Sequence, residues 1–312
     1  MLASTLVVPA WGALGACKSA DVPREATAAP ARAREVTARI DAQPTLEGAG
    51  VRLRRSLGSS ALPLLDPFLM LDEFSSENPD DYVAGFPAHP HRGFETVTYM
   101  LNGRMLHQDH LGHRGELRGG GAQWMTAGRG IVHSEMPRQQ DGLMWGFQLW
   151  VNLPAAEKMT EPRYQDVSPE RVPEVAPSTG ARVRVVAGRV AGVEGPVAGI
   201  ATRPLYLDVS LDAGASFAHE LPAGHNAFVY VFDGEAEVGP PDGAGTRVAA
   251  GHLAVLGEGD TCLARAGERG ARALLVAARP IGEPVVRYGP FVMNTREEIQ
   301  EALRDFREGR LG

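Results

Sequence analysis

From residue 39 onward, apolar and polar positions alternate over short runs that are separated by turns rich in glycine and proline. Residues 51–54 alternate strictly, and residues 95–101 form a run of strand-forming side chains that ends at Asn102-Gly103. Asn-Gly is a strong signal for a two-residue hairpin, because both positions tolerate a positive φ. Residues 145–151 alternate again. Short strands at regular spacing predict an antiparallel barrel or sandwich.

A polar stretch divides this strand pattern in two. Residues 155–180 contain four prolines and are predicted to be a linker. Strand-like runs restart at residue 181, and Asp233-Gly234 predicts a tight hairpin between two of them. The two halves, residues 39–154 and 181–312, therefore look like two copies of one β architecture.

A single short helix is predicted near the C-terminal end. Thr295 can cap it, and Glu298, three residues later, completes a capping box. Ile299, Leu303 and Phe306 share one face at spacings of four and three residues. We interpret this segment as a packing helix of the second barrel and not as a partner-binding helix.

The composition is that of a globular protein and argues against a nucleic-acid surface. Of the 312 residues, 44% are hydrophobic, which is enough for a sizeable core. The 31 basic and 38 acidic residues give a net charge of -7, which opposes phosphate binding. Cys17 and Cys262 lie in unrelated parts of the pattern, so no disulfide framework is implied.

The first 38 residues do not follow the strand pattern and are excluded from the predicted fold. Residues 1–16 are uncharged and mostly apolar, and small residues precede Cys17. One interpretation is an export signal with a lipid-accepting cysteine, which would make the protein a cell-envelope lipoprotein. The other is a disordered or mis-started extension of a cytoplasmic protein, since no positively charged segment precedes the apolar run. We favour the envelope interpretation, and the cytoplasmic one stays open.

Two pairs of side chains carry the candidate chemistry. His89 and His91 are two residues apart, as are His133 and Glu135. On a strand, residues i and i+2 point to the same face. Neighbouring strands would therefore bring three imidazoles and one carboxylate together, which is a ligand set for a borderline divalent metal. We predict a metal site at these four residues.

The remaining acidic and histidine residues near this stretch are less informative. Glu95 shares the face of His91 only if no bulge intervenes, so an outer-sphere acid and a structural role both stay open. His107, His110 and His113 are spaced by three, which fits neither a strand face nor a compact metal motif. We expect a solvated loop here, with His107 as the one residue that could line the pocket.

Four segments of the chain resemble the pirin family of the cupin superfamily. They are residues 65–69 (LDPFL), 86–97 (FPAHPHRGFETV), 123–135 (QWMTAGRGIVHSE) and 289–295 (GPFVMNT). The resemblance implies an all-β fold of two tandem cupin-type antiparallel barrels, a bicupin, that face each other. It also implies iron, usually ferrous, in the N-terminal barrel only, with His89, His91, His133 and Glu135 as its ligands.

The resemblance further implies a dioxygenase similar to the quercetin-cleaving members, which open a flavonol ring with O2. Glu135 could then take the proton of the substrate hydroxyl. An apolar cavity for a flat aromatic ligand would be lined by side chains that are equally ordinary core residues: Phe86, Phe94, His107, Trp124 and Met125.

Alternatives stay open on three points. Some pirins are thought to be regulatory, so an iron-containing redox sensor that acts through a protein partner is the rival function, and an inert scaffold would remain if no metal binds. Three nitrogens and one oxygen also suit Mn, Co, Ni, Cu or Zn. The residues themselves indicate no more than a small aromatic substrate, and a monomer is the default expectation.

Overall fold

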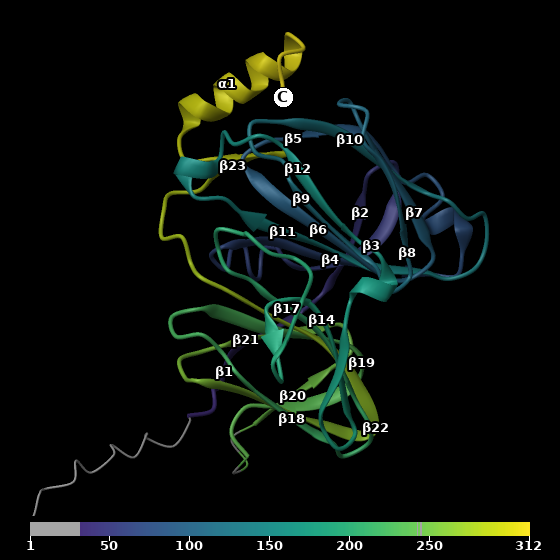
Figure 1. Cartoon of the computed structure of the whole chain (residues 1–312), viewed down its shortest axis with the longest axis vertical. Coiled ribbons are helices and arrows are strands. Elements are labelled where there is room, and N and C mark those ends of the chain that lie inside the picture. Colours follow the sequence, from purple (N-terminus) through teal and green to yellow (C-terminus); the bar gives the residue numbers. More distant parts are fainter. Residues whose placement is uncertain (1–31, 242, 244) are drawn as a thin grey trace, which may run out of the picture. The chain divides into compact units, whose positions relative to one another are not determined.

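The structure, a computed structural model, describes residues 32–241, 243 and 245–312 (Figure 1). Strands dominate it, and one α-helix lies near the C-terminal end. The predicted all-β class with a single C-terminal helix is therefore confirmed. Within the described residues, no helix combines the length and apolarity needed to cross a membrane. The predicted export segment with Cys17 lies outside the described residues.

The N-terminal half forms a barrel from a seven-stranded and a four-stranded sheet, in which all strand pairs are antiparallel. The larger sheet runs in the order β12 (Arg163–Val167), β9 (Ala122–Thr126), β6 (Phe94–Asn102), β11 (Met144–Asn152), β4 (Phe68–Ser76), β3 (Val51–Leu57) and β2 (Gln43–Glu47). The smaller sheet runs in the order β5 (Phe86–His91), β10 (Ile131–Pro137), β7 (Arg104–Asp109) and β8 (Arg114–Arg118).

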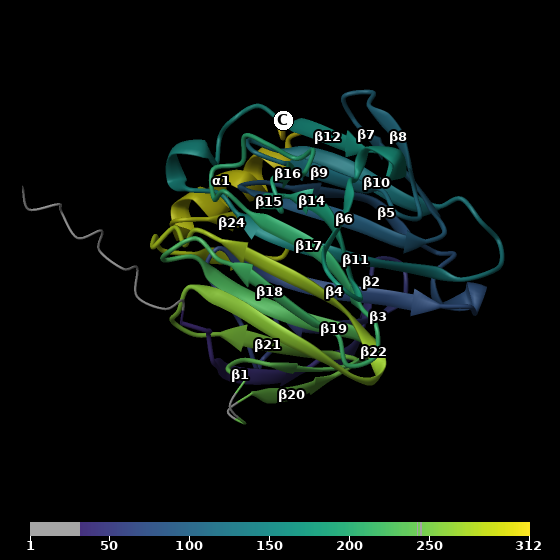
Figure 2. The same ribbon diagram turned by 60° about the horizontal axis from the view of Figure 1, so that its bottom comes forward.

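The C-terminal half is built on one nine-stranded antiparallel sheet (Figure 2). Its main path runs β1 (Val36–Asp41), β21 (His252–Leu256), β19 (Asn226–Val238), β22 (Thr261–Ala278), β17 (Leu205–Leu211), β14 (Ala181–Ala187) and β13 (Glu174–Ser178). Two further strands pair with β22 and β19 respectively: β18 (Ser216–Glu220) and β20 (Thr246–Ala249).

The remaining elements are short and connect or extend the two sheets. They are the hairpin strands β15 (Arg189–Val190) and β16 (Val193–Glu194), the hairpin strands β23 (Val286–Tyr288) and β24 (Phe291–Met293), the helix α1 (Arg296–Arg307), and the 3-10 turns η1 (Pro79–Asp81), η2 (Ala155–Glu157) and η3 (Pro169–Arg171).

The structure differs from the predicted boundaries at both ends of the strand pattern. Strand β1 begins before residue 39 and pairs with β21 of the C-terminal half, because its alternating apolar side chains cover that edge. The predicted linker, residues 155–180, contains β12, which extends the N-terminal sheet, and β13, which extends the C-terminal sheet. The chain therefore gives one strand, β1, to the C-terminal sheet before it enters the N-terminal barrel, and the predicted linker instead contributes a strand to each sheet.

The two predicted hairpin turns have different outcomes. Asn102-Gly103 joins β6 to β7, and Gly103 has a φ of 87°, as the prediction requires. The prediction of a turn at Asp233-Gly234 is wrong, because β19 continues through it with a shift in its register against β22. A Cβ on Gly234 would stand 2.1 Å from the carbonyl oxygen of Gly270. The glycine is therefore needed for a bulge and not for a hairpin.

A large apolar core lies between the seven-stranded sheet of the N-terminal half and the nine-stranded sheet of the C-terminal half. Val97 and Leu149 from the N-terminal half share it with Tyr230 and Leu274 from the C-terminal half. Buried hydroxyls at this core are paired across the halves: the hydroxyl of Tyr230 donates to Glu73 Oε2 at 2.6 Å. Because a buried hydroxyl without a partner would be costly, such pairs fix how the two sheets pack.

The C-terminal segment returns from the second barrel to the first. The backbone amide of Val292 donates to the carbonyl of Arg92, and the Arg92 guanidinium pairs with Asp305 of α1 at 2.9 Å. The ammonium of Lys158 is almost fully buried and donates to the carbonyls of Gly93 and Val292. The helix predicted to belong to the second barrel therefore packs, through β24, against the first.

Helix α1 begins with the predicted capping box. The Thr295 hydroxyl accepts from the backbone amide of Glu298, and the Glu298 carboxylate accepts from that of Thr295. The backbone amides of Thr295 and Glu298, which have no partner within the helix, are thereby hydrogen-bonded. Ile299 is buried in the same cluster as Phe291 and Met293 of β24. The predicted packing face of this helix is therefore confirmed at Ile299, while Phe306 is 42% exposed.

Candidate metal centre

Three of the four predicted ligands meet between two neighbouring strands. Strand β5 pairs with β10 so that His133 lies opposite His89, and Ile131 opposite His91. The ring centroids of the three histidines are 4.4 to 4.9 Å apart. One nitrogen from each ring can be chosen so that all three lie within 4.8 Å of one another. The period-2 spacing therefore places three imidazoles at one point of the barrel.

The geometry of His89 and His91 suits a shared cation. Their Nε2 atoms are 3.0 Å apart. Two nitrogens that each lie about 2.1 Å from a metal and subtend a right angle would be about 3.0 Å apart. His89 Nδ1 lies 2.8 Å from the Pro87 carbonyl and can donate to it, which leaves the Nε2 lone pair free. The chain thereby selects the tautomer that ligation requires.

Burial keeps the other two rings uncharged. His91 and His133 are each 2% exposed. Burial, together with the neighbouring histidines, holds the pKa of each ring well below its usual value. His133 Nε2 is buried and has no hydrogen-bond partner among the described residues. Neutral rings with a free buried nitrogen are what a divalent metal needs, so the residues fit such a cofactor.

Glu135 lies in the same barrel but outside this group of three. Its Oε1 is 2.9 Å from the Thr98 hydroxyl, and its Oε2 accepts from the Gln148 amide at 3.1 Å. The pairing of β10 with β5 shifts register between His133 and Glu135, so the carboxylate is displaced along the strand. The side chain is 4% exposed and lines the same cavity as His89 and His91.

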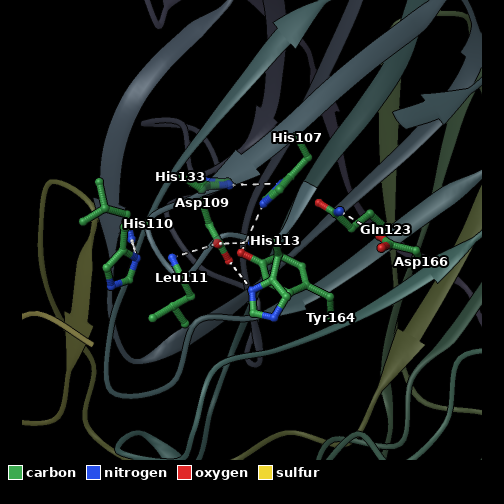
Figure 3. Close-up of polar contacts among 10 residues, drawn as sticks. His107, Asp109, His110, Leu111, His113, Gln123, His133, Tyr164 and Asp166 are labelled. Atoms are coloured by element: carbon green, nitrogen blue, oxygen red, sulfur yellow. Dashed lines mark hydrogen bonds and ion pairs between the residues drawn. The ribbon is translucent and has the colours of Figure 1, made fainter. Parts of the chain in front are cut away.

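A chain of polar side chains extends from His133 toward the surface (Figure 3). His107 lies between His133 and Tyr164: its Nδ1 is 3.4 Å from His133 Nδ1 and its Nε2 is 3.1 Å from the Tyr164 hydroxyl. Beside Tyr164, the carboxylate of Asp109 is 2.8 Å from the ring of the exposed His113. His107 therefore contacts His133 and does not line the cavity. His110 and His113 are exposed, as expected.

A cavity of about 510 Å³ opens beside the histidines. Of the predicted pocket residues, Phe86 lines it, and Phe94 instead packs its ring on His91. Trp124 lies in the core between the two sheets and Met125 in a separate small cluster, so neither lines the cavity. Trp124 is opposite Val97 on β6, on the face of the sheet that is turned away from the histidines.

Several cavity residues were not predicted from the sequence. Gln148 and Trp150 alternate with the interface residues of β11 and so face the cavity, which the period of the strand could have revealed. Arg55 of β3 and Arg287 of β23 also line it. Arg287 is far from the histidines in sequence and reaches them only because the C-terminal segment returns to the first barrel.

Glu95 does not join the metal site. Its carboxylate accepts from the Thr126 hydroxyl at 2.7 Å and is 1% exposed. Burial raises its pKa to about 7. The break at Gly93 between β5 and β6 puts Glu95 on the opposite face from His91, next to Trp124 and Thr126. Of the two roles left open for Glu95, the geometry fits the structural one.

The chain is similar to known proteins of one family. The family model described as Pirin matches residues 50–151, and the model described as Pirin C-terminal cupin domain matches residues 206–312. A Pseudomonas aeruginosa protein with the provisional name quercetin 2,3-dioxygenase is 52% identical over 289 residues, which cover 89% of this chain and 98% of that protein. Human pirin is 44% identical over 281 residues, covering 89% and 94%.

A solved structure has the same fold. The crystal structure of a quercetin 2,3-dioxygenase from Acinetobacter baumannii superposes with a TM-score of 0.82 at 33% identity, covering 89% of this chain and 98% of that one. The two-barrel architecture expected from the sequence is therefore confirmed.

Proposed function

We propose that this chain, which belongs to the pirin family, is a metal-dependent dioxygenase that cleaves a flavonol-like aromatic substrate, such as quercetin, with O2. One observation carries the proposal: three histidines meet beside a cavity large enough for a drug-sized aromatic molecule. The name of the Pseudomonas relative and the fold of the Acinetobacter enzyme support the choice of reaction.

The metal is proposed to be Fe(II), with Mn, Co, Ni, Cu and Zn as the alternatives that the same donors suit. His89, His91 and His133 would hold it, and Glu135 would complete the set from the same strand as His133. Bound there, a divalent metal would lower the pKa of a substrate hydroxyl and orient the substrate.

The chain's own residues would then handle the substrate. Glu135 would accept the proton of the metal-binding hydroxyl, since it lines the cavity together with His89 and His91. Thr98 and Gln148 would hold that carboxylate in position. Phe86 lines the cavity and would pack on a flat ring, while the Trp150 ring already packs against Phe94 and Arg287.

The second candidate function is an iron-containing redox sensor that acts through a protein partner. The polar chain from His133 through His107 to Tyr164 favours it, because a change at the metal would be felt near the exposed loop that carries His113. In this function the metal would bind without turnover, and its oxidation state would change the affinity for the partner.

The test is a metal-dependent turnover measurement on the full chain. The protein is incubated anaerobically with Fe(II) and quercetin, O2 is admitted, and loss of flavonol absorbance and release of carbon monoxide are followed. His133→Ala removes a proposed ligand, and His219→Ala serves as the matched control because His219 stacks on Phe217 in the other barrel.

We expect turnover in the wild type and in His219→Ala and none in His133→Ala. Metal binding at one ion per chain without turnover would overturn the dioxygenase and leave the redox sensor. The absence of metal binding in the wild type would contradict both functions.

A further inference from the structure

Arg287 reaches the metal-site cavity from the C-terminal segment. It lies on β23, and its side chain lines the cavity together with His89 and His91. Its guanidinium carbon stands 4.7 Å from the centroid of the Trp150 ring. The Trp150 ring in turn contacts the His91 ring, with centroids 5.2 Å apart. A single aromatic ring therefore separates this cation from the metal-site histidines.

The two cations that line the cavity differ in their partners. Arg55 donates twice to Asp72, at 2.8 and 2.7 Å, and once to Glu47 at 2.8 Å. Arg287 has no carboxylate within 4 Å among the described residues, and its recorded hydrogen bond is a long one of 3.4 Å to the Gly289 carbonyl. Since Asp72 is occupied by Arg55, most donors of Arg287 are free for another acceptor.

Stacking on Trp150 fixes the position of this guanidinium and leaves its N–H donors available to a ligand. A cation over an aromatic face is held by the ring quadrupole, and its N–H donors remain available at the edge of the plane. That edge presents a planar fork, which matches a carboxylate with two parallel hydrogen bonds.

Anchoring of the C-terminal segment does not require Arg287. Val292 is fully buried against Leu69 and Phe94, and the ammonium of Lys158 binds the Val292 carbonyl. The Arg287 side chain, by contrast, is exposed at the mouth of the cavity. Anchoring of the segment therefore does not account for the position of Arg287 over the Trp150 ring beside the cavity.

We infer that Arg287 is a specificity-determining residue, and that it favours flavonol-like planar substrates that carry a carboxylate. The carboxylate would bind Arg287 while a hydroxyl at the far end of the same flat molecule faces the three histidines. Trp150 would hold the guanidinium in place, since Arg287 and Phe94 already pack against its ring, and the substrate rings would lie in the part of the cavity that Phe86 lines. This inference rests on the proposed function, because it assumes that the substrate occupies this cavity with a hydroxyl at the metal.

The experiment compares two probes that differ only at the remote end. Both are 3-hydroxyflavones, and their phenyl ring carries a para carboxylate in one and a para carboxamide in the other. The full chain is loaded with Mn(II) and kept anaerobic, so that no turnover is needed. The dissociation constant of each probe is measured from the shift in flavone absorbance, and the ratio of the two constants is the readout.

The wild type should bind the carboxylate probe about tenfold more tightly than the carboxamide, as expected for charge-assisted hydrogen bonds. Arg287→Gln should bring the ratio close to one while the affinity for the carboxamide stays the same. Arg287→Lys should give an intermediate ratio, because lysine keeps the charge but not the planar fork. Arg182→Gln, on β14 and paired with Asp212, is the control that should keep the wild-type ratio.

Two results would overturn the inference, and they are distinguishable. Equal binding of both probes by the wild type, or an unchanged ratio in Arg287→Gln, would refute the role of Arg287 and leave the proposed function intact. Failure of the wild type to bind either probe would refute the proposed function as well, because both probes carry the same metal-binding hydroxyl and ketone.

Discussion

In the N-terminal barrel, β5 and β10 bring His91 and His133 together beside a cavity, whereas the corresponding interior of the C-terminal barrel is occupied by Val183, Leu207 and Val229. The C-terminal interior continues in this way with alanine, valine, leucine and Cys262. No group of three or more histidine, cysteine or acidic side chains comes together among its described residues. The same strand architecture therefore supports either a polar site or a dry core.

The difference shows that the interior of one cupin-like barrel cannot be both fully packed with apolar side chains and open enough to hold a polar site with a cavity. Filling the C-terminal barrel with apolar side chains contributes about 25 cal/mol for each Å² removed from water. The N-terminal barrel gives up part of that stabilisation to keep a cavity and several buried polar groups. The shared core between the sheets compensates, because it joins the hollow barrel to the filled one.

The largest effect should come from removing a histidine that faces the cavity. His91→Ala is expected to abolish stoichiometric metal binding, with a loss greater than the 10- to 100-fold that is typical of an outer-sphere partner. Equilibrium dialysis against Fe(II) or Mn(II) measures it. His252→Ala, a histidine of the second barrel that pairs with Asp41, should bind metal as the wild type does. Equal metal binding by both variants would remove the distinction between the barrels.

The C-terminal interior should affect stability and not metal. Leu207 is fully buried there, so Leu207→Ala should lower the free energy of unfolding by about 2 to 5 kcal/mol. Urea denaturation provides the measurement, and the metal content of the folded variant should stay at the wild-type value. A variant that keeps its stability but loses its metal would show that the two interiors do not have separate roles.

A buried acid of the N-terminal half makes stability depend on pH. Burial raises the pKa of Glu95 to about 7, above its unfolded value of 4.5, so the folded state binds the extra proton. Its contribution is fully present below pH 4.5 and is lost as the pH rises through 7. At pH 8, Glu95→Gln should therefore be more stable than the wild type by up to about 3 kcal/mol.

Urea denaturation at pH 4.5 and at pH 8 compares the two proteins directly. Thr126 can still donate to the amide oxygen of the variant, so the two stabilities should be similar at the lower pH. A difference that does not change between the two pH values would contradict the raised pKa of Glu95, because the folded and unfolded states would then bind protons equally.

The smallest effect concerns the support of His133. His107→Ala removes the ring that contacts His133 Nδ1 and should weaken metal affinity by roughly 10- to 100-fold without changing the stoichiometry. His110→Ala, in the exposed turn that follows β7, is the control. If both variants bind metal equally well, His107 contributes only to packing and does not position His133.

Local patterns in the sequence predicted the strands and three residues of the site. The i, i+2 spacing placed His89 and His91 on one face of a strand, and pairing with a neighbouring strand was expected to bring His133 opposite them. The same rule placed Glu135 in the cavity but could not anticipate the shifted register that separates it from the histidines. Asp233-Gly234 also misled the prediction, since a bulge and a hairpin use the same glycine conformation.

Long-range packing accounts for what the sequence could not reveal. Arg287 approaches the histidines only because β24 and α1 return to the first barrel, and no local pattern encodes that path. Trp124 illustrates the opposite failure, as its aromatic side chain looked suitable for a pocket but belongs to the core between the sheets. Strand faces can be predicted from alternation, whereas the choice of which face meets the second barrel depends on the whole fold.

The most direct test of the account is the amount of metal bound per chain, measured by elemental analysis after dialysis against Fe(II) or Mn(II). The account predicts one ion per chain in the wild type and in Leu207→Ala, and none in His91→Ala. One ion per chain in His91→Ala would contradict it, because the metal would then lie outside the N-terminal barrel site.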